Sequence, residues 1–180
     1  MNIFDRHFEM LKRNQDIFEQ YKLNENVGIK IPENHHKDYC KTGIELLSVE
    51  RIEQLLEVRS VYYYNIVHRT LEEYTLSEWI VCLNEGILLE YAVPILSRAL
   101  ERYPMLCGMN NEWQVLFYIT MINEEFWFEH KEWKNCFCEL IKDICVQHEN
   151  GRFVEAIPNE YLYQFKLFEN DKVEDVLDGF

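Results

Sequence analysis

The chain has 180 residues, of which 48% are hydrophobic and 14% aromatic, which is enough to bury a core and excludes a largely disordered protein. Its formal net charge is −14, and the acidic excess grows from −2 over residues 1–60 (11 acidic, 9 basic) to −8 over residues 121–180 (14 acidic, 6 basic). Direct nucleic-acid binding needs clustered lysine and arginine, so this charge argues against it and suits a basic protein partner.

The first residues contain neither the basic region nor the apolar run of a secretory signal peptide. No apolar run reaches the roughly 18 residues that a membrane span needs. We therefore expect a cytoplasmic protein with no membrane span, whose six cysteines are reduced and mostly buried.

Helical periodicity predicts a first helix over residues 2–22. The periodicity is then lost over residues 24–43, which we interpret as a long loop, a kind of segment that is usually functional or mobile. Apolar spacing resumes after Ser48, a candidate cap, and predicts a second helix that continues to about Arg69.

Three threonines each precede a glutamate by three residues, which is the spacing of a capping box at the start of a helix. These pairs are Thr42 with Glu45, Thr70 with Glu73, and Thr75 with Glu78. The last two predict a short break after Arg69 and a new helix from Leu76.

Gly86 marks the end of that helix, and the next is expected over residues 87–102. Pro94 either kinks this helix or starts it, because proline lacks the backbone donor. The residue before Pro104 avoids the helical region, so the helix stops there. Residues 112–122 form the most apolar segment, and their length favours a helix over a buried strand.

The central prediction is one long amphipathic helix over residues 123–151, with Asn123 as its cap and Gly151 as a left-handed terminator. Its apolar face would comprise Phe126, His130, Trp133, Phe137, Leu140, Ile144 and His148. The same spacing on another side gives an acidic line of Glu125, Glu129, Glu132, Glu139 and Asp143.

The segment 153–168 is ambiguous between two structures. Pro158 could be the first residue of a helix, whereas alternating apolar residues in the second half fit a strand. Residues 169–180 form an acidic end. Taken together, the elements predict an all-α fold that forms a single compact domain over residues 1–180. The domain would contain about six to seven mostly antiparallel helices, and a short strand near the C-terminus remains an alternative.

Two groups of residues have side chains that could bind a metal: the run from His35 to Cys40, and Cys145 with His148. Each lacks a second pair at metal-binding spacing, so we interpret the first as a solvated loop and the second as packing residues. No nucleophile elbow or phosphate-binding glycine loop is present. We therefore expect no catalytic residue, no bound metal and no cofactor, and hence no enzyme.

The expected function is protein binding. The candidate contact residues are acids of the predicted helix and of the acidic end, together with three consecutive tyrosines that cannot all be buried on one helix face. They are Glu125, Glu129, Glu132, Glu139, Asp143, Glu169, Asp171, Glu174, Asp175, Tyr62, Tyr63 and Tyr64. For the acids, a solvated outer face that only keeps the protein soluble is the alternative interpretation.

In size, acidity, single-domain build and lack of an active-site pattern, the chain resembles bacterial immunity proteins of polymorphic or contact-dependent toxin systems. This resemblance is one of overall character and assigns no residue a role. It implies a tight complex with a cognate toxin domain, often a basic nuclease, whose active site the acidic surface would block. The alternative is a helical adaptor or assembly subunit that binds through apolar and aromatic surface. The oligomeric state is left open.

Overall fold

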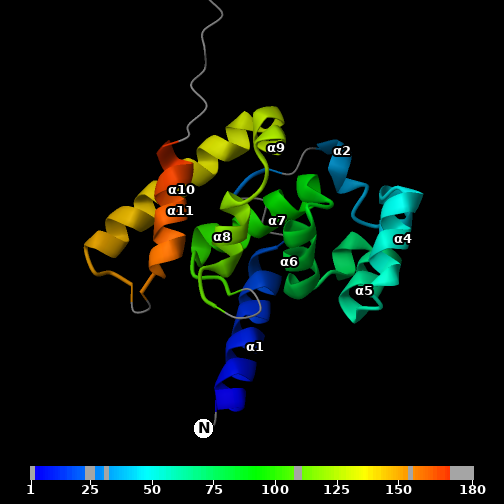
Figure 1. Ribbon diagram of the computed structural model, residues 1–180, viewed down its shortest axis with the longest axis horizontal. Coiled ribbons are helices and arrows are strands. Elements are labelled where there is room, and N and C mark those ends of the chain that lie inside the picture. Colours follow the sequence, from blue (N-terminus) through cyan, green and yellow to red (C-terminus); the bar gives the residue numbers. More distant parts are fainter. Residues whose placement is uncertain (1–2, 23–26, 31–32, 108–110, 154–155, 171–180) are drawn as a thin grey trace, which may run out of the picture. The chain divides into compact units, whose positions relative to one another are not determined.

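The computed structural model describes residues 3–22, 27–30, 33–107, 111–153 and 156–170 (Figure 1). Every regular element in these residues is a helix, and an isolated bridge joins Thr42 and Thr70, so the predicted all-α class is confirmed. No helix among them is both long enough and apolar enough to cross a membrane. The chain divides into two compact units, 1–115 and 116–180, and the expected single domain stays a prediction.

The first unit is built around α7, whose residues from Ala92 to Leu100 are all buried. Helix α7 packs against α1 and α6, and α6 packs in turn against α5, which lies beside α4 (Figure 1). The elements of this unit are α1 (Ile3–Tyr21), α2 (Glu33–His36), α3 (Gly43–Leu46), α4 (Val49–Glu57), α5 (Val61–His68), the 3-10 helix η1 (Leu71–Glu73), α6 (Leu76–Glu85) and α7 (Leu89–Arg102). Helix α8 (Gln114–Thr120) follows, so the apolar segment 112–122 is helical as predicted.

Local capping chemistry sets the helix starts in this unit. The three predicted capping boxes are present and open α3, η1 and α6. Ser48 caps α4 by accepting from the Arg51 amide at 3.3 Å, and Gly86 ends α6 in the left-handed conformation. Pro94 lies inside α7, so the interpretation of this proline as a helix start is wrong.

The helix predicted from Ser48 to Arg69 is divided into α4 and α5. Arg59 has a positive φ of 54°, which interrupts the helical backbone. Ser60 then caps α5 by accepting a hydrogen bond from the Tyr62 amide at 3.3 Å. The break allows the two short helices to pack against each other as a hairpin.

The predicted long loop over residues 24–43 contains ordered and buried structure. Helix α2 lies within it, and Val27, Ile29 and Tyr39 are buried. Polar groups of α7 hold this segment in place: the Ile29 amide donates to Ser97 Oγ at 2.8 Å, and the Gly28 amide donates to the Glu101 carboxylate. Val27, Ile29 and Tyr39, in the described part of this segment, therefore belong to the core of the first unit.

Replacing Gly28 with alanine should destabilise the protein by about 2–4 kcal/mol. Gly28 has a φ of +70°, and an added Cβ would lie 2.6 Å from Ser97 Oγ and 2.8 Å from the Arg98 amide nitrogen. Gly86→Ala is the matched control, because Gly86 has a φ of +64° with nothing within 4 Å, so its loss should be about 1 kcal/mol. Urea unfolding of both variants measures the difference, and equal losses would contradict the close contact at Gly28.

The second unit contains residues 116–120 of α8, α9 (Glu124–Glu129), α10 (Lys131–Glu149) and α11 (Asn159–Asn170). Helix α11 packs along α10 (Figure 1). The rings of Trp127 and Phe168 have centroids 5.5 Å apart, and Phe117 stacks on Tyr161 at 4.2 Å. An aromatic core thus joins the helices of this unit.

The prediction of one helix over residues 123–151 is wrong, because the chain leaves the helical conformation at His130 (φ −120°, ψ 50°). The His130 amide closes α9 by donating to the Phe126 carbonyl at 3.0 Å. Its ring stacks on Trp133 at 4.3 Å and packs against Phe126 at 4.4 Å, and these contacts stabilise the junction. The two ends are as predicted: Asn123 caps α9, and Gly151 has a φ of +65° after α10.

The buried face of α10 is also displaced from the predicted one. Of the predicted face, Trp133, Leu140 and His148 are only partly buried. The buried residues of α10 are Lys134, Phe137, Cys138, Ile141, Ile144 and Cys145. In α11, Tyr161, Phe165 and Phe168 are buried at helical spacing, so the strand interpretation of this segment is wrong.

Candidate partner-binding surfaces

The five predicted acids of residues 123–151 are all exposed, and we call them the acidic face: Glu125, Glu129, Glu132, Glu139 and Asp143. On α10, steps of seven and four residues return to nearly the same direction, so Glu132, Glu139 and Asp143 lie on one side of the helix. Glu125 and Glu129 lie on α9, before the junction at His130. The acidic face is therefore two groups on two helices, and the single unbroken line expected from the sequence is wrong.

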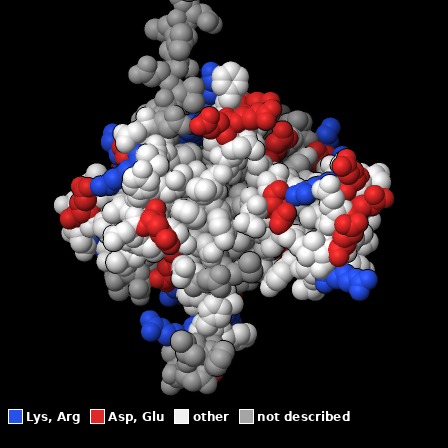
Figure 2. All heavy atoms as spheres, viewed as in Figure 1, with Lys and Arg blue, Asp and Glu red and all other residues white. Residues whose placement is uncertain are grey.

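Helix α10 carries three lysines, Lys131, Lys134 and Lys142, which differ in exposure: Lys142 is exposed, Lys131 is partly buried and Lys134 is buried. Lys134 is only 4% exposed, and its ammonium lies 5.5 Å from the centre of the Phe168 ring, inside the unit. Lys166 contacts Glu149 at 3.7 Å, away from the five acids in sequence. Figure 2 shows acidic atoms gathered at the top of the view, over the place that α9 occupies in Figure 1. The five acids of the acidic face therefore share the surface of α9 and α10 with Lys131 and Lys142, while Lys134 is withdrawn from it.

Phe128 is an exposed aromatic residue on α9 that the sequence reasoning missed. Its side chain is 69% exposed, whereas Phe126 and Trp127 beside it are buried. The sequence does contain a signal, because three consecutive aromatic residues cannot all point to one side of a helix. The same geometry applies to the three consecutive tyrosines from Tyr62 to Tyr64.

The three tyrosines lie on α5, in the first unit, and have different roles. Tyr62 and Tyr64 are 37% and 57% exposed, as expected for at least one of the three. Tyr63 is half-buried, and its hydroxyl donates to Glu85 Oε1 at 2.6 Å, which raises the pKa of Tyr63. Tyr63 therefore has a structural hydrogen bond between α5 and α6, and only Tyr62 and Tyr64 are available to a partner.

Apolar side chains accompany the two exposed tyrosines. We call the set the α4–α5 surface, and its members are Val49, Leu56, Val58, Val61, Tyr62 and Tyr64, all at least 37% exposed. All six belong to one helical hairpin, where they offer apolar area that a partner could bury. This is the second candidate surface of the chain.

The remaining predicted contact residues belong to the acidic end. Glu169 lies near the end of α11 and is half-buried. Burial raises the pKa of the Cys145 thiol, and the nearby charge of Glu169 adds to that rise. Asp171, Glu174 and Asp175 lie outside the described residues. The structure therefore supports Glu169 less than the five residues of the acidic face.

Three side chains of the run from His35 to Cys40, those of His35, Asp38 and Tyr39, contact the side chain of Tyr91 on α7. Asp38 contacts Lys41 at 2.6 Å and accepts from the Tyr91 hydroxyl at 3.0 Å, and these bonds lower the pKa of Asp38. His35 also contacts Glu90 at 3.5 Å, and the Cys40 thiol donates to the Lys37 carbonyl. No group of three metal-binding side chains is present in the described part of the chain. These contacts attach α2 and the following turn to α7.

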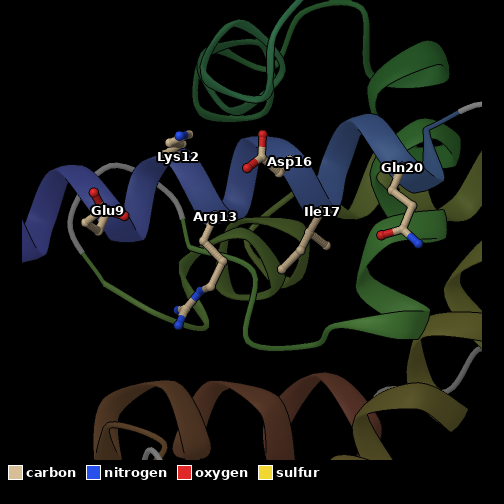
Figure 3. A pocket seen from close by; sticks show the side chains of 6 residues that line it. All are labelled: Glu9, Lys12, Arg13, Asp16, Ile17 and Gln20. Atoms are coloured by element: carbon tan, nitrogen blue, oxygen red, sulfur yellow. The ribbon is translucent and has the colours of Figure 1, made fainter.

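A shallow hollow of about 300 Å³ runs along α1 in the first unit. Its lining residues are Glu9, Lys12, Arg13, Asp16, Ile17 and Gln20. Figure 3 shows Lys12 and Asp16 on one side of the helix and Arg13 and Ile17 on the other. Arg13 already forms an ion pair with Glu112 at 2.7 Å. These side chains diverge, so they do not form a catalytic arrangement.

We expect only two of the six cysteines, Cys40 and Cys136, to react with a thiol reagent such as DTNB in the folded protein. They are exposed, whereas the other four are buried. Burial raises the pKa of Cys82, and raises that of Cys107 to about 11, so little reactive thiolate is present at neutral pH. All six should react after unfolding, and rapid reaction of more than two in the native protein would contradict the structure.

Comparison of this chain with protein-family models, with curated proteins and with solved structures found no match. Function is therefore inferred from the surfaces described above.

Proposed function

We propose that this protein is a non-catalytic inhibitor that binds a basic protein through the acidic face of α9 and α10. In this proposal it acts as a bacterial immunity protein in the cytoplasm and blocks the active site of a cognate toxin domain. The observation that carries the proposal is the exposure of all five acids on two adjoining helices while Lys134 is buried. Such a field speeds the arrival of a basic partner and excludes acidic ones.

Retention of the acids has a cost to the free protein, which favours a role beyond folding. Glu125 and Glu129 are four residues apart on α9, and Glu139 and Asp143 are four apart on α10. Like charges at this spacing destabilise a helix by about 0.2–0.5 kcal/mol per pair. Cationic groups of a basic partner would be attracted to both acids of each pair and would offset this repulsion.

Affinity capture of the tagged protein from its source cells, washed at low and then high salt, tests the proposal. We expect a near-stoichiometric basic protein that is retained at low salt and released at high salt, because exposed charge interactions are screened. The captured protein should be toxic when expressed alone and harmless when co-expressed with this chain. Capture of only neutral or acidic proteins would contradict the proposal.

A second candidate function, an adaptor or assembly subunit, is favoured by the α4–α5 surface. Val49 and Val61 are 72% and 66% exposed, and burying such side chains in a partner stabilises a complex. This function predicts a complex, or self-association, that is insensitive to salt. Light scattering at low and high salt separates the two candidates.

A further inference from the structure

The ring of Phe128 already binds a cation of its own chain. Lys131 Nζ lies 4.8 Å from the centre of this ring, within the range of a cation–π contact. Phe128 nevertheless remains 69% exposed, so a large part of the ring is open to a partner. Phe128 is on α9 and Lys131 is the first residue of α10, so the contact spans the junction at His130.

Exposed carboxylates share the side of α9 that carries this ring. Glu124 and Glu125 precede Phe128 by four and three residues, which is one helical turn. An aromatic face with two carboxylates one helical turn away matches the chemistry of a guanidinium group, which stacks on rings and donates two parallel hydrogen bonds to a carboxylate. The ammonium of a lysine is compact and strongly hydrated, so it cannot stack flat on the ring or form the same paired hydrogen bonds to a carboxylate.

We propose that Phe128 is the docking point for an arginine side chain of the basic partner, and that this arginine displaces Lys131 from the ring. The inference rests on the proposed function and specifies which group of the partner the acidic face recognises. Lys131 is the stand-in for that group in the free protein. Lys131 lowers the affinity for arginine because it competes for the ring. It also excludes cations that bind the ring more weakly than arginine does.

The test measures binding of a fluorescein-labelled octa-arginine peptide by fluorescence anisotropy at low ionic strength. Lys131→Met removes the competing cation, and Lys142→Met is the matched control, because Lys142 is an exposed lysine of the same helix. Both variants change the net charge equally, but only the first uncovers the ring. We expect Lys131→Met to bind the peptide about two- to fivefold more tightly than Lys142→Met.

Phe128→Leu keeps an apolar side chain but removes the aromatic face, so it should bind octa-arginine about two- to fivefold more weakly than the natural protein. The preference for octa-arginine over octa-lysine should also fall in this variant. Equal binding by Lys131→Met and Lys142→Met, or unchanged binding by Phe128→Leu, would overturn the inference.

A triple variant, Glu129→Gln, Glu132→Gln and Glu139→Gln, separates this inference from the proposed function. If the triple variant binds octa-arginine as the natural protein does, the acidic face is not the binding surface. The proposed function and the arginine site are then both wrong. Suppose instead that the triple variant loses binding, while Phe128→Leu binds like the natural protein and Lys131→Met binds like Lys142→Met. The acidic face is then the binding surface, and the proposed arginine site at Phe128 is wrong.

Discussion

Replacing Glu129, Glu132 and Glu139 together with glutamine should weaken binding of the basic partner by about 100-fold or more. Each exposed charge that faces an opposite charge in a complex contributes on the order of 1 kcal/mol, and 1.4 kcal/mol corresponds to a factor of ten. The loss should appear mainly as slower association and as a weaker dependence of affinity on salt. Titration calorimetry with the captured partner, at two salt concentrations, measures both.

The folding stability of this triple variant should be unchanged or slightly higher, since glutamine keeps the shape of the side chain and removes like-charge repulsion on α9 and α10. A matched control removes the same number of exposed acids from α4, as Glu50→Gln, Glu53→Gln and Glu57→Gln. The control carries the same net charge and should retain nearly full affinity. Equal losses in the two variants would show that only total charge matters.

Glu78→Ala should cost about 3–5 kcal/mol of folding stability, the largest effect expected of a single change in the first unit. Glu78 is 2% exposed, and its carboxylate accepts from the Thr75 amide at 2.6 Å and from Asn65 Nδ2 at 2.7 Å. Arg69 lies 3.6 Å from the same carboxylate. Removing the acid would leave the part-buried donors of Asn65 on α5 and of Thr75, the cap of α6, without their acceptor.

Glu73→Ala is the matched control for this variant. Glu73 occupies the same capping-box position in η1, where its carboxylate accepts from the Thr70 amide at 2.9 Å, but it is exposed. Its loss should be about 0.5–1 kcal/mol, the usual contribution of a capping interaction. Chemical unfolding of both variants gives the comparison, and similar losses would contradict the importance of burial at Glu78.

Local chemistry explains which parts of the fold could be predicted from the sequence. A capping box needs only a threonine and a glutamate three residues apart, so all three boxes were predicted correctly. The same holds for Gly86, whose positive φ favours glycine. Exposure of the acidic face also follows from periodicity, because carboxylates avoid the core.

The two helix breaks could not be predicted in the same way. At His130, the ring contacts with Phe126 and Trp133 depend on the folded unit and leave no turn signal in the sequence. At Arg59 the positive φ occurs in a residue that rarely adopts it, and Ser60 was the one available signal, as a residue type that often caps helices.

The sequence predicts the exposed acids of α9 and α10, but it does not predict which aromatic and basic residues of these helices are exposed. Lys134 would be expected in solvent, yet it is buried beside Phe168. Phe128 would be expected in the core, yet it is exposed under Lys131. Both placements depend on which side of α9 and α10 faces α11, and only the tertiary fold determines that.

The most direct test of the central claim uses Cys136, an exposed thiol on the same side of α10 as Glu132 and Glu139. In a Cys40→Ser variant, the rate of maleimide labelling at Cys136 is measured with and without the captured partner. We expect the bound partner to slow labelling at Cys136 at least tenfold, while Cys40 in a Cys136→Ser variant keeps its rate. Unchanged labelling of Cys136 in a fully formed complex would show that the partner binds elsewhere.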